Sequence, residues 1–302
     1  FFFKQKTAYE IKECDWSSDV CSSDLKKIAK RLNAKYIKAS IHIFADGESK
    51  ITIPRSPKGK TIVVNSTYPP TDSNLIQTFS LIDEAKKYAS DIVAIIPYLG
   101  YLRQDIAFLP GEVVTSKVIA ESFSAVGASQ IITIDAHSDI ALSYFKIPTK
   151  NVSAINKLAQ YCKKLNLKNP LVAAPDFFWS ANAKKFADVL STDSIAINKQ
   201  RDPKTGKIQI ISTKMRDLQG RDVIILDDMI TTGISTIKAA NLLKRQNCGR
   251  LYACCTHGIL VNDAKTRIKN AGIEKIICTN TIPGTNSFVD VSDLLASAVL
   301  SF

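Results

Sequence analysis

The sequence predicts an α/β protein with two similar domains, each a mainly parallel sheet flanked by helices. Short apolar runs of strand length alternate with longer segments that have helical spacing. This alternation is typical of parallel sheets that helices cover on both faces. It begins near Lys26 and starts a second round after Asn151, so we expect domains at 26–150 and 151–290.

The individual elements follow from the same apolar spacing. In the first domain we expect strands at Thr61–Asn65, Asp91–Ile96 and Gln130–Asp135, and helices at Asn74–Tyr88 and Val113–Val126. In the second domain we expect a helix ending at Leu165, another at Ala181–Leu190, and strands at Leu171–Ala174, Ser194–Asn198 and Ile208–Ser212. No strand follows the final helix at 291–302, so we expect this helix to pack back on the first domain.

The first 25 residues differ from the rest of the chain. They have no clear helical or strand period, contain Trp16 and two cysteines, and lack the cleavage pattern of a signal peptide. The string resembles translated sequencing-adapter read-through, so we expect 1–25 to be a non-native segment that contributes no element of the fold. Lys26–Leu32 then reads as the end of a helix.

Composition limits the classes of function. The 302 residues, 45% of them hydrophobic, are enough for two cores, and no apolar run approaches the ~20 residues of a membrane span. Seven cysteines without metal-ligand spacing favour a reducing cytoplasm over a disulfide framework. The net charge of +12 predicts an anionic partner. Because no dense basic block with interleaved aromatics occurs, we expect a phosphorylated small molecule, and neither nucleic acid nor a membrane.

One stretch, VIILDDMITTGIST at Val223–Thr236, carries the strongest chemical signal. Its apolar run Val223–Leu226 predicts a buried parallel strand that ends on Asp227 and Asp228. The loop that follows leads into a helix at Lys238–Gln246, and its residues are Thr231, Thr232, Gly233, Ile234 and Ser235. Unpaired N–H groups at a helix start favour an anion, and carboxylates accept hydrogen bonds from a sugar diol. The stretch therefore predicts a sugar-phosphate site.

A simple capping turn is the alternative interpretation, because Asp, Thr, Ser and Gly are also common in ordinary strand–helix turns. Two adjacent carboxylates after an apolar strand favour the ligand site, since their mutual repulsion is unfavourable unless a ligand or cation relieves it. The stretch also resembles the phosphoribosyl pyrophosphate (PRPP) motif. Type I phosphoribosyltransferases and ribose-phosphate pyrophosphokinases both carry that motif.

Six further segments resemble ribose-phosphate pyrophosphokinases (PRPP synthases), and they occur in the family's order across nearly the whole chain from Lys26. They are HIFADGE at His42–Glu48, PYLGYLRQD at Pro97–Asp105, IITIDAH at Ile131–His137, APD at Ala174–Asp176, THG at Thr256–Gly258 and NTIP at Asn280–Pro283. The resemblance implies two tandem domains of the type I phosphoribosyltransferase-like fold.

The same resemblance implies roles for residues of the first domain. Phe44 would stack on adenine while Asp46 and Glu48 hold its amino edge and ribose, and the ATP contacts would come from Arg103, Gln104 and Asp105. His137 would help to hold Mg²⁺ and ATP, and Asp176, in the second domain, would lie near a second metal. Each piece has a simpler alternative: an ion pair between Arg103 and Asp105, an exposed hairpin rim for the FADGE acids, and a turn residue for His137.

Lys199 and Arg201 distinguish the two families. In PRPP synthases a Lys and an Arg at this spacing supply positive charge to the β-phosphate under attack, and phosphoribosyltransferases do not combine such a pair with an RQD segment. The alternative is a solvated basic turn before the polar segment DPKTGK.

The resemblance therefore implies transfer of diphosphate from Mg-ATP to ribose 5-phosphate, in a homo-oligomer whose ATP site lies near a subunit interface. Two alternatives stay open, an inactive PRPP-synthase-associated regulatory subunit and a phosphoribosyltransferase that uses PRPP. FLPGE at Phe108–Glu112 resembles archaeal-type members. Two departures from the family stand out: Ile234 replaces a glycine, and Phe177-Phe178-Trp179 replaces small residues.

Overall fold

The structure is a computed structural model that describes residues 8–12, 19–54, 59–201, 208–211 and 218–302. The chain divides into two compact units. The first unit comprises Phe1–Val152, Thr281–Pro283 and Asp290–Phe302, and the second comprises Ser153–Asn280 and Gly284–Val289. Each unit is a helix-flanked, mainly parallel sheet, which confirms the predicted α/β class. Of the helices in the described ranges, none is long and apolar enough to span a membrane.

The first unit contains, in its described part, a seven-stranded sheet of order β3-β2-β1-β4-β5-β6-β7. Its strands are β1 (Ala8–Lys12), β2 (Lys35–Ile43), β3 (Ser49–Thr52), β4 (Lys60–Val64), β5 (Asp91–Ile96), β6 (Gln130–Ile134) and β7 (Thr149–Val152). All pairs are parallel except the β2–β3 hairpin. The three strands predicted from apolar runs are found as β4, β5 and β6, because residues buried on both faces leave an uninterrupted apolar signal.

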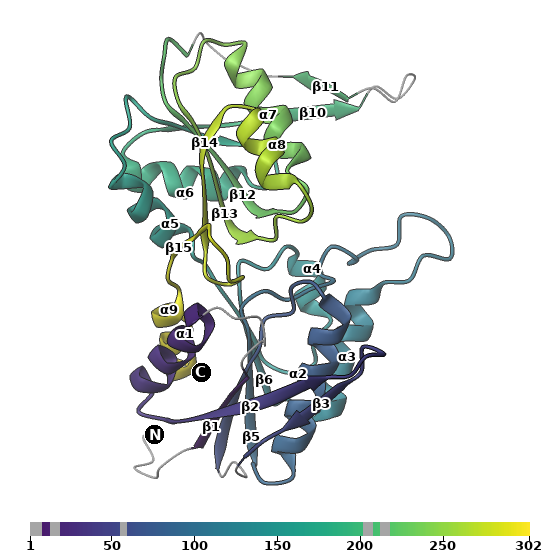
Figure 1. The fold of residues 1–302 in the computed structure, drawn as a ribbon. Helices are drawn as coiled ribbons and strands as arrows, with labels where there is room; N and C mark the ends of the chain where they lie inside the picture. Colours follow the sequence, from purple (N-terminus) through teal and green to yellow (C-terminus); the bar gives the residue numbers. More distant parts are fainter. Residues whose placement is uncertain (1–7, 13–18, 55–58, 202–207, 212–217) are drawn as a thin grey trace. The chain divides into compact units, whose positions relative to one another are not determined.

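Helices cover both faces of this sheet (Figure 1). One face carries α1 (Asp19–Arg31) and α9 (Ser292–Leu300), which lie against each other, and the other carries α2 (Thr71–Lys86) and α3 (Thr115–Val126). The short α4 (Asp139–Ser143) follows β6. Ile96, Leu81 and Phe123 are fully buried in the core that α2 and α3 close.

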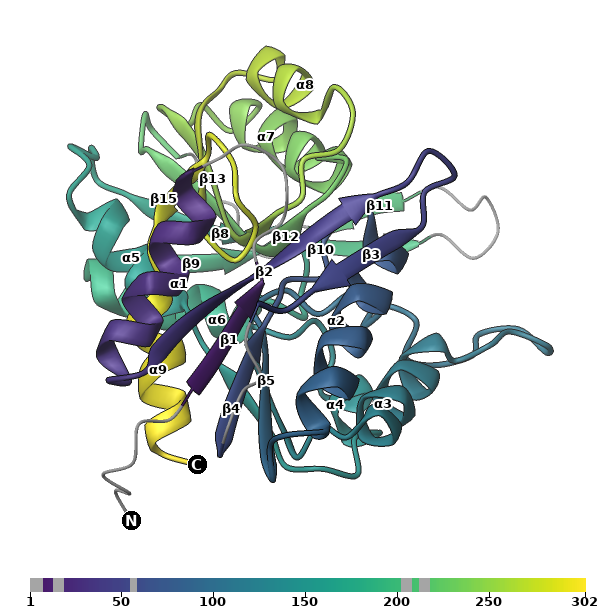
Figure 2. The same ribbon diagram turned by 60° about the horizontal axis from the view of Figure 1, so that its bottom comes forward.

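The N-terminal segment does contribute to the fold, contrary to our expectation for 1–25. β1 pairs in parallel with β2 on one side and β4 on the other, as Figure 2 shows, and α1 begins at Asp19. The physical reason is that ladder hydrogen bonds use backbone groups, which every non-proline residue has. A segment without an amphipathic period can therefore fill the position between two strands that would otherwise expose their edges.

The second unit has, among the described residues, a six-stranded sheet of order β15-β14-β13-β12-β8-β9, in which every pair is parallel. Its strands are β8 (Leu171–Ala174), β9 (Asp193–Ala196), β12 (Val223–Ile230), β13 (Leu251–Gly258), β14 (Ile273–Thr279) and β15 (Ser287–Val289). A separate antiparallel ribbon pairs β10 (Asn198–Arg201) with β11 (Ile208–Ile211). The central strand β12 lies between β8 and β13.

Two helix pairs cover this sheet on opposite faces (Figure 1). They are α5 (Ile155–Lys163) with α6 (Ser180–Leu190), and α7 (Ile234–Lys244) with α8 (Ala264–Asn270). Ala239, Ala240 and Leu243 of α7 and Ile268 of α8 pack on Val223 and other apolar residues of the sheet.

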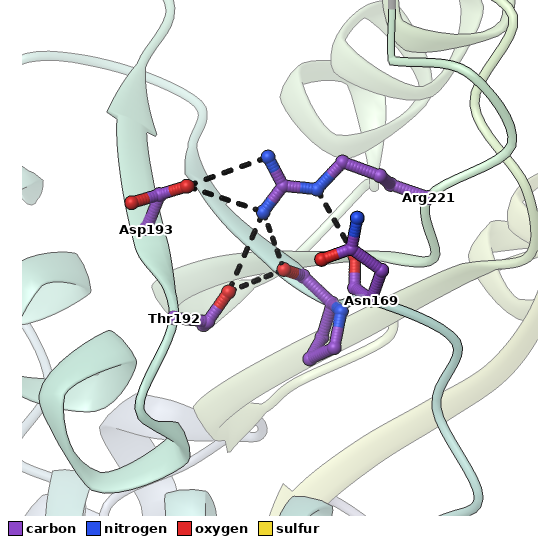
Figure 3. A network of polar contacts seen from close by, with 5 residues as sticks. Asn169, Thr192, Asp193 and Arg221 are labelled. Atoms are coloured by element: carbon purple, nitrogen blue, oxygen red, sulfur yellow. Dashed lines mark hydrogen bonds and ion pairs between the residues drawn. The ribbon is translucent and has the colours of Figure 1, made fainter.

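The amino ends of β8, β9 and β12 are joined by arginine contacts. Figure 3 shows the Arg221 guanidinium donating to the carbonyl oxygen of Asn169 (3.0 Å) and lying 3.4 Å from the Asp193 carboxylate. Next to it in sequence, Asp222 is 2% exposed and accepts hydrogen bonds from Arg250 Nη2 (2.6 Å) and the Lys168 N–H (2.7 Å). Burial opposes ionisation of Asp222, but these hydrogen bonds outweigh it and lower the pKa of its carboxyl.

We predict that Asp222→Ala lowers the free energy of unfolding by about 3 kcal/mol, because it removes the buried acceptor of several part-buried hydrogen bonds from Lys168 and Arg250. The matched control is Asp193→Ala, which removes an arginine partner whose side chain is 79% exposed and should cost less than about 1 kcal/mol. Urea denaturation of both variants at neutral pH measures the difference. Equal destabilisation by the two substitutions would contradict the role given to Asp222.

The stabilisation by Asp222 should also depend on pH. Its pKa is lower in the folded than in the unfolded protein, so the stabilisation is present above about pH 4 and is lost as the pH falls through the lowered folded value. The difference in free energy of unfolding between wild type and Asp222→Ala should therefore decrease as the pH falls through that acidic range.

Candidate functional site

The carboxyl end of β12 is the centre of the candidate site in the second unit. The strand was predicted to end on Asp227 and Asp228, but it continues beyond them to Ile230, because Met229 and Ile230 still pair with β13. The ends of β8 and β13 lie on either side, since all three strands are parallel. In open parallel sheets, ligands bind outside this edge.

Asp227 and Asp228 form a crowded carboxylate pair. Asp228 is 5% exposed and Asp227 is half-buried, and Asp227 Oδ1 accepts the Asp228 N–H (3.0 Å). Burial raises the pKa of Asp227 well above its ordinary value, and the negative charges of Asp228 and then Asp176 raise it further. A hydrogen-bond donor or a cation at this position would relieve the repulsion, so the geometry suits a sugar diol or a metal-bound ligand.

The loop after β12 turns directly into α7. Gly233 has φ +75° and ψ 3°, and α7 begins at Ile234. A Cβ on Gly233 would lie 2.7 Å from Ile268 Cδ1, so both backbone conformation and space require glycine here. The next N–H groups belong to a helix start and have no intrahelical acceptor, which makes the loop suitable for a phosphate.

Ile234, which stands where the family has glycine, does not adopt a positive φ. Among the described residues with positive φ, Gly233 is included and Ile234 is not. Ile234 is instead the first residue of α7, with its side chain 49% exposed. A β-branched residue is compatible with that conformation, because helical φ is negative.

The residues after Asp176 also depart from the family without blocking the backbone. Asp176 Oδ1 accepts the Trp179 N–H at 3.3 Å and so shapes the turn before α6. Phe177 and Phe178 are 70% and 95% exposed, and neither belongs to the buried core. Asp176 is close enough to Asp227 to raise its pKa, so the structure brings these predicted ligand residues together.

In the first unit, the Arg103 segment is fixed by hydrogen bonds on each side. The Gln104 carbonyl accepts from Ser116 Oγ (2.9 Å), and the Asp105 carboxylate accepts from Ser138 Oγ (2.6 Å). Tyr144 OH donates to the Asp105 carbonyl (2.8 Å). Arg103 and Gln104 themselves are exposed. The structure thus presents these two side chains on an anchored loop beside the residue that follows His137 in sequence.

These hydrogen bonds rule out the alternative of an ion pair between Arg103 and Asp105. The same loop also makes a contact that the sequence did not indicate. Within the described part of the chain, Asp105 pairs with Ser138 and no ion pair joins it to Arg103. Tyr101 has φ +66°, rare for a non-glycine residue, and its OH donates to Asp72 at 2.5 Å. The Asp72 and Tyr101 pair is 29 residues apart. No local pattern signals a contact over that distance.

Phe44, Asp46 and Glu48 lie on the β2–β3 hairpin. Asp46 Oδ1 accepts the Glu48 N–H (3.1 Å), and the Phe44 ring contacts His42 edge-on with centroids 4.9 Å apart. All three predicted residues are exposed, with Phe44 at 45%. The contacts found for Phe44 and Asp46 are internal to the hairpin, so the structure does not bring them to Arg103.

Two predicted features stay predictions. Lys199 and Arg201 stand two positions apart on β10, opposite Ile210 and Ile208, but their side chains lie outside the described residues. His137 is exposed after β6, and among the described residues no group of three or more His, Cys, Asp or Glu side chains is arranged to hold a metal. A divalent cation that also binds substrate phosphates needs only one or two protein carboxylates. Asp176 and the nearby Asp227 can supply them.

Two tandem, mainly parallel sheets, the second with an acidic strand end and a glycine-capped helix start, define a two-domain α/β protein of the phosphoribosyltransferase-like class. A crystal structure of phosphoribosylpyrophosphate synthetase from Mycobacterium smegmatis has this fold. It matches the chain with a TM-score of 0.84 and 25% identity, covering 98% of each chain.

Sequence comparison gives the family. Residues 20–127 match the N-terminal domain of ribose phosphate pyrophosphokinase, and 183–300 match a phosphoribosyl synthetase-associated domain. The Methanopyrus kandleri ribose-phosphate pyrophosphokinase is 36% identical over 91% of this chain and 94% of its own length. The Shewanella oneidensis enzyme is 35% identical over 91% and 89%. The chain belongs to the ribose-phosphate pyrophosphokinase family. These near-equal identities leave the archaeal-type resemblance a prediction.

We predict that Asp227→Asn stabilises the ligand-free protein at neutral and alkaline pH. The folded pKa of Asp227 is raised, so its ionisation opposes folding as the pH rises from about 4 through that raised value. Asparagine has nearly the same shape and no charge. The melting temperature of the variant should therefore exceed that of wild type at pH 8 and equal it near pH 4.

The control is Asp188→Asn, which removes the charge of an exposed carboxylate on α6. Its melting temperature should follow that of wild type across the same pH range. An equal rise in melting temperature for both variants would mean that general charge reduction, and not relief of the unfavourable charge at Asp227, is the cause.

Proposed function

We propose that the protein transfers the terminal diphosphate of ATP to the anomeric hydroxyl of ribose 5-phosphate, giving PRPP and AMP. The hydroxyl oxygen bonds to the β-phosphorus, and the bond from that phosphorus to the oxygen bridging to the α-phosphate breaks. The observation that carries the proposal is the acidic end of β12 followed directly by the Gly233-capped start of α7. This arrangement places carboxylates that can accept hydrogen bonds from a sugar diol next to a helix start that can bind an anion.

The second unit holds ribose 5-phosphate in this proposal. Asp227 and Asp228 accept hydrogen bonds from the ribose hydroxyls, which supports their ionised forms against burial and repulsion. The backbone from Thr231 to Ser235 binds the 5-phosphate, because its N–H groups lie at the amino end of α7. Because the backbone N–H groups contact the phosphate directly, the loop selects a sugar that carries a phosphate group at this position.

Residues of the first unit hold ATP. Arg103 can donate two parallel hydrogen bonds to phosphate oxygens, and Gln104 and Asp105 complete the segment. Phe44 stacks on adenine, Asp46 and Glu48 bind its polar edge and ribose, and His137 helps to hold Mg²⁺ with the nucleotide. In the second unit, Asp176 is the proposed metal ligand. Mg²⁺ bound to the phosphates supplies positive charge against the negative charge that develops during transfer.

Lys199 and Arg201 supply the remaining positive charge to the β-phosphate. Phosphoryl-group transfer needs positioning and charge neutralisation more than covalent help, so two cations on one ribbon are a sufficient device. We also propose a homo-oligomer, in which the exposed hairpin residues Ile43 and Phe44 lie near a subunit interface beside the ATP site. The five described cysteines are free thiols, which supports a reducing compartment, the cytoplasm.

The test is direct. Incubating the full chain with ATP, Mg²⁺ and ribose 5-phosphate should give AMP and PRPP in equal amounts, measured by mass spectrometry. ADP formation, or no product from a protein that binds both substrates, would contradict the proposal. Chelation with EDTA should abolish product formation and leave the fold, followed by circular dichroism, unchanged.

A second prediction concerns Lys199. Lys199→Ala should lower kcat by about 10²-fold or more, because charge that stabilises the transition state is lost, while the KM for ribose 5-phosphate changes little. Steady-state kinetics with each substrate varied in turn separates the two effects. A parallel rise in the KM for ribose 5-phosphate would assign Lys199 to binding instead.

A catalytically inactive subunit that associates with a PRPP synthase is the second candidate. The match of residues 183–300 to a synthetase-associated domain favours it. In that case the purified chain would give no AMP alone but would change the activity of an active synthase added at stoichiometric amounts.

A further inference from the structure

The backbone after Asp228 is held by one segment of the second unit. The carbonyl of Ile230 accepts the Leu260 N–H (2.9 Å), and the carbonyl of Thr231 accepts the Val261 N–H (3.1 Å). The carbonyl of Thr232 accepts a hydrogen bond from Nη2 of Arg267 on α8 (2.8 Å). Three consecutive carbonyls therefore bind partners from residues 260–267. The last partner is a charged side chain.

Peptide geometry turns this observation into a statement about the N–H groups. In a trans peptide the C=O of one residue and the N–H of the next point in opposite directions. The carbonyls of residues 230 to 232 face the 260–267 segment, so the N–H groups of Thr231, Thr232 and Gly233 face away from it. In the described part of the chain, none of these three N–H groups has an acceptor. Converging backbone N–H groups of this kind form an anion-binding concavity.

Arg267 also forms an ion pair with the residue that precedes α8. Its Nε lies 2.9 Å from Asp263 Oδ1, and its side chain is 39% exposed against 65% for Asp263. The neighbouring Ile268 is fully buried and fills the space beside Gly233, where a Cβ would lie 2.7 Å from Ile268 Cδ1. Helix α8 therefore contacts the loop through two adjacent side chains, one polar and one apolar.

The segment that leads into α8 carries backbone strain. Leu260 has φ +49° and Asn262 has φ +54°, a region that costs about 1 kcal/mol or more for residues with a side chain. Strain of this kind persists where the surrounding structure requires it. Here the conformation directs the N–H groups of Leu260 and Val261 towards the carbonyls of the loop.

We propose that Arg267 is a positioning residue for the phosphate site, which it serves by holding the Thr232 carbonyl so that the Gly233 N–H is available to the phosphate of the sugar. Its second contribution is a positive charge behind the loop, which favours a dianionic ligand on the opposite side. The proposal rests on the proposed function, because it takes the 5-phosphate of ribose 5-phosphate as the ligand.

The experiment compares three single variants. Arg267→Met removes both the donor and the charge, Arg267→Lys keeps one donor and the charge, and Lys269→Met removes the same charge from an exposed position on the same helix. Steady-state kinetics should show that Arg267→Met raises the KM for ribose 5-phosphate at least about tenfold, while the KM for ATP stays within about twofold. Arg267→Lys should recover most of that loss, and Lys269→Met should match wild type.

Three outcomes overturn the proposal. Arg267→Met with an unchanged KM for ribose 5-phosphate would show that the loop needs no arginine. An equal rise for Lys269→Met would assign the effect to the charge of α8 in general. Equal rises in the KM for both substrates, with a lower melting temperature, would show loss of folding alone.

A measurement without substrate separates this inference from the proposed function. Amide hydrogen exchange of residues 231–235 in the ligand-free protein should be faster in Arg267→Met than in Lys269→Met, because the carbonyl anchor is lost. If wild type makes no PRPP but exchange changes as described, the function proposal fails and the anchoring stands. If wild type is active and exchange is unchanged, the reverse holds.

Discussion

The central strands of the two sheets lie between helix layers, so they are buried on both faces and mainly apolar, and this constraint leaves charged groups to the strand ends. β5 has its residues from Ile92 to Ile96 almost completely buried, as does β12 from Val223 to Leu226. An unpaired charge within such a strand would cost several kcal/mol. Charged groups therefore collect at the two edges of each sheet. The two edges of the second unit use them in opposite ways.

At the amino edge, carboxylates and arginines neutralise one another. The pKa of Asp222 is lowered because hydrogen bonds to its carboxylate stabilise the charge more than burial destabilises it. Arg221, which precedes β12, contacts residues at the amino ends of β8 and β9 and so joins three neighbouring strands. At the carboxyl edge, burial and the negative charges of Asp228 and Asp176 raise the pKa of Asp227. The same residue type thus stabilises the fold at one end of β12 and, at the other, maintains an unfavourable site that a ligand can relieve.

The sequence was sufficient for the parts of the fold that depend on local pattern. β5 and β8 have the predicted bounds, because a strand buried on both faces is a continuous apolar run. The continuation of β12 beyond Asp228 to Ile230 was missed, since its cause is pairing with β13 and not composition. The participation of residues 8–12 in the first sheet was missed for a related reason, because ladder hydrogen bonds carry no side-chain signal. The family's motif has glycine at the position of Ile234, whereas in this chain the residue with positive φ is Gly233. Asp227, Asp228 and the glycine loop were predicted as a site from residue type and order, but Arg267 lies 35 residues from Thr232 and has no local signal.

The anchoring of the three loop carbonyls has a thermodynamic consequence. In the ligand-free protein the residues 230–232 already have their acceptors occupied by Leu260, Val261 and Arg267. An arriving anion then meets donors in their final orientation, so little conformational entropy is lost on binding. Such a site behaves as a rigid receptor whose occupancy follows the concentration of free ligand, without a slow folding step before capture.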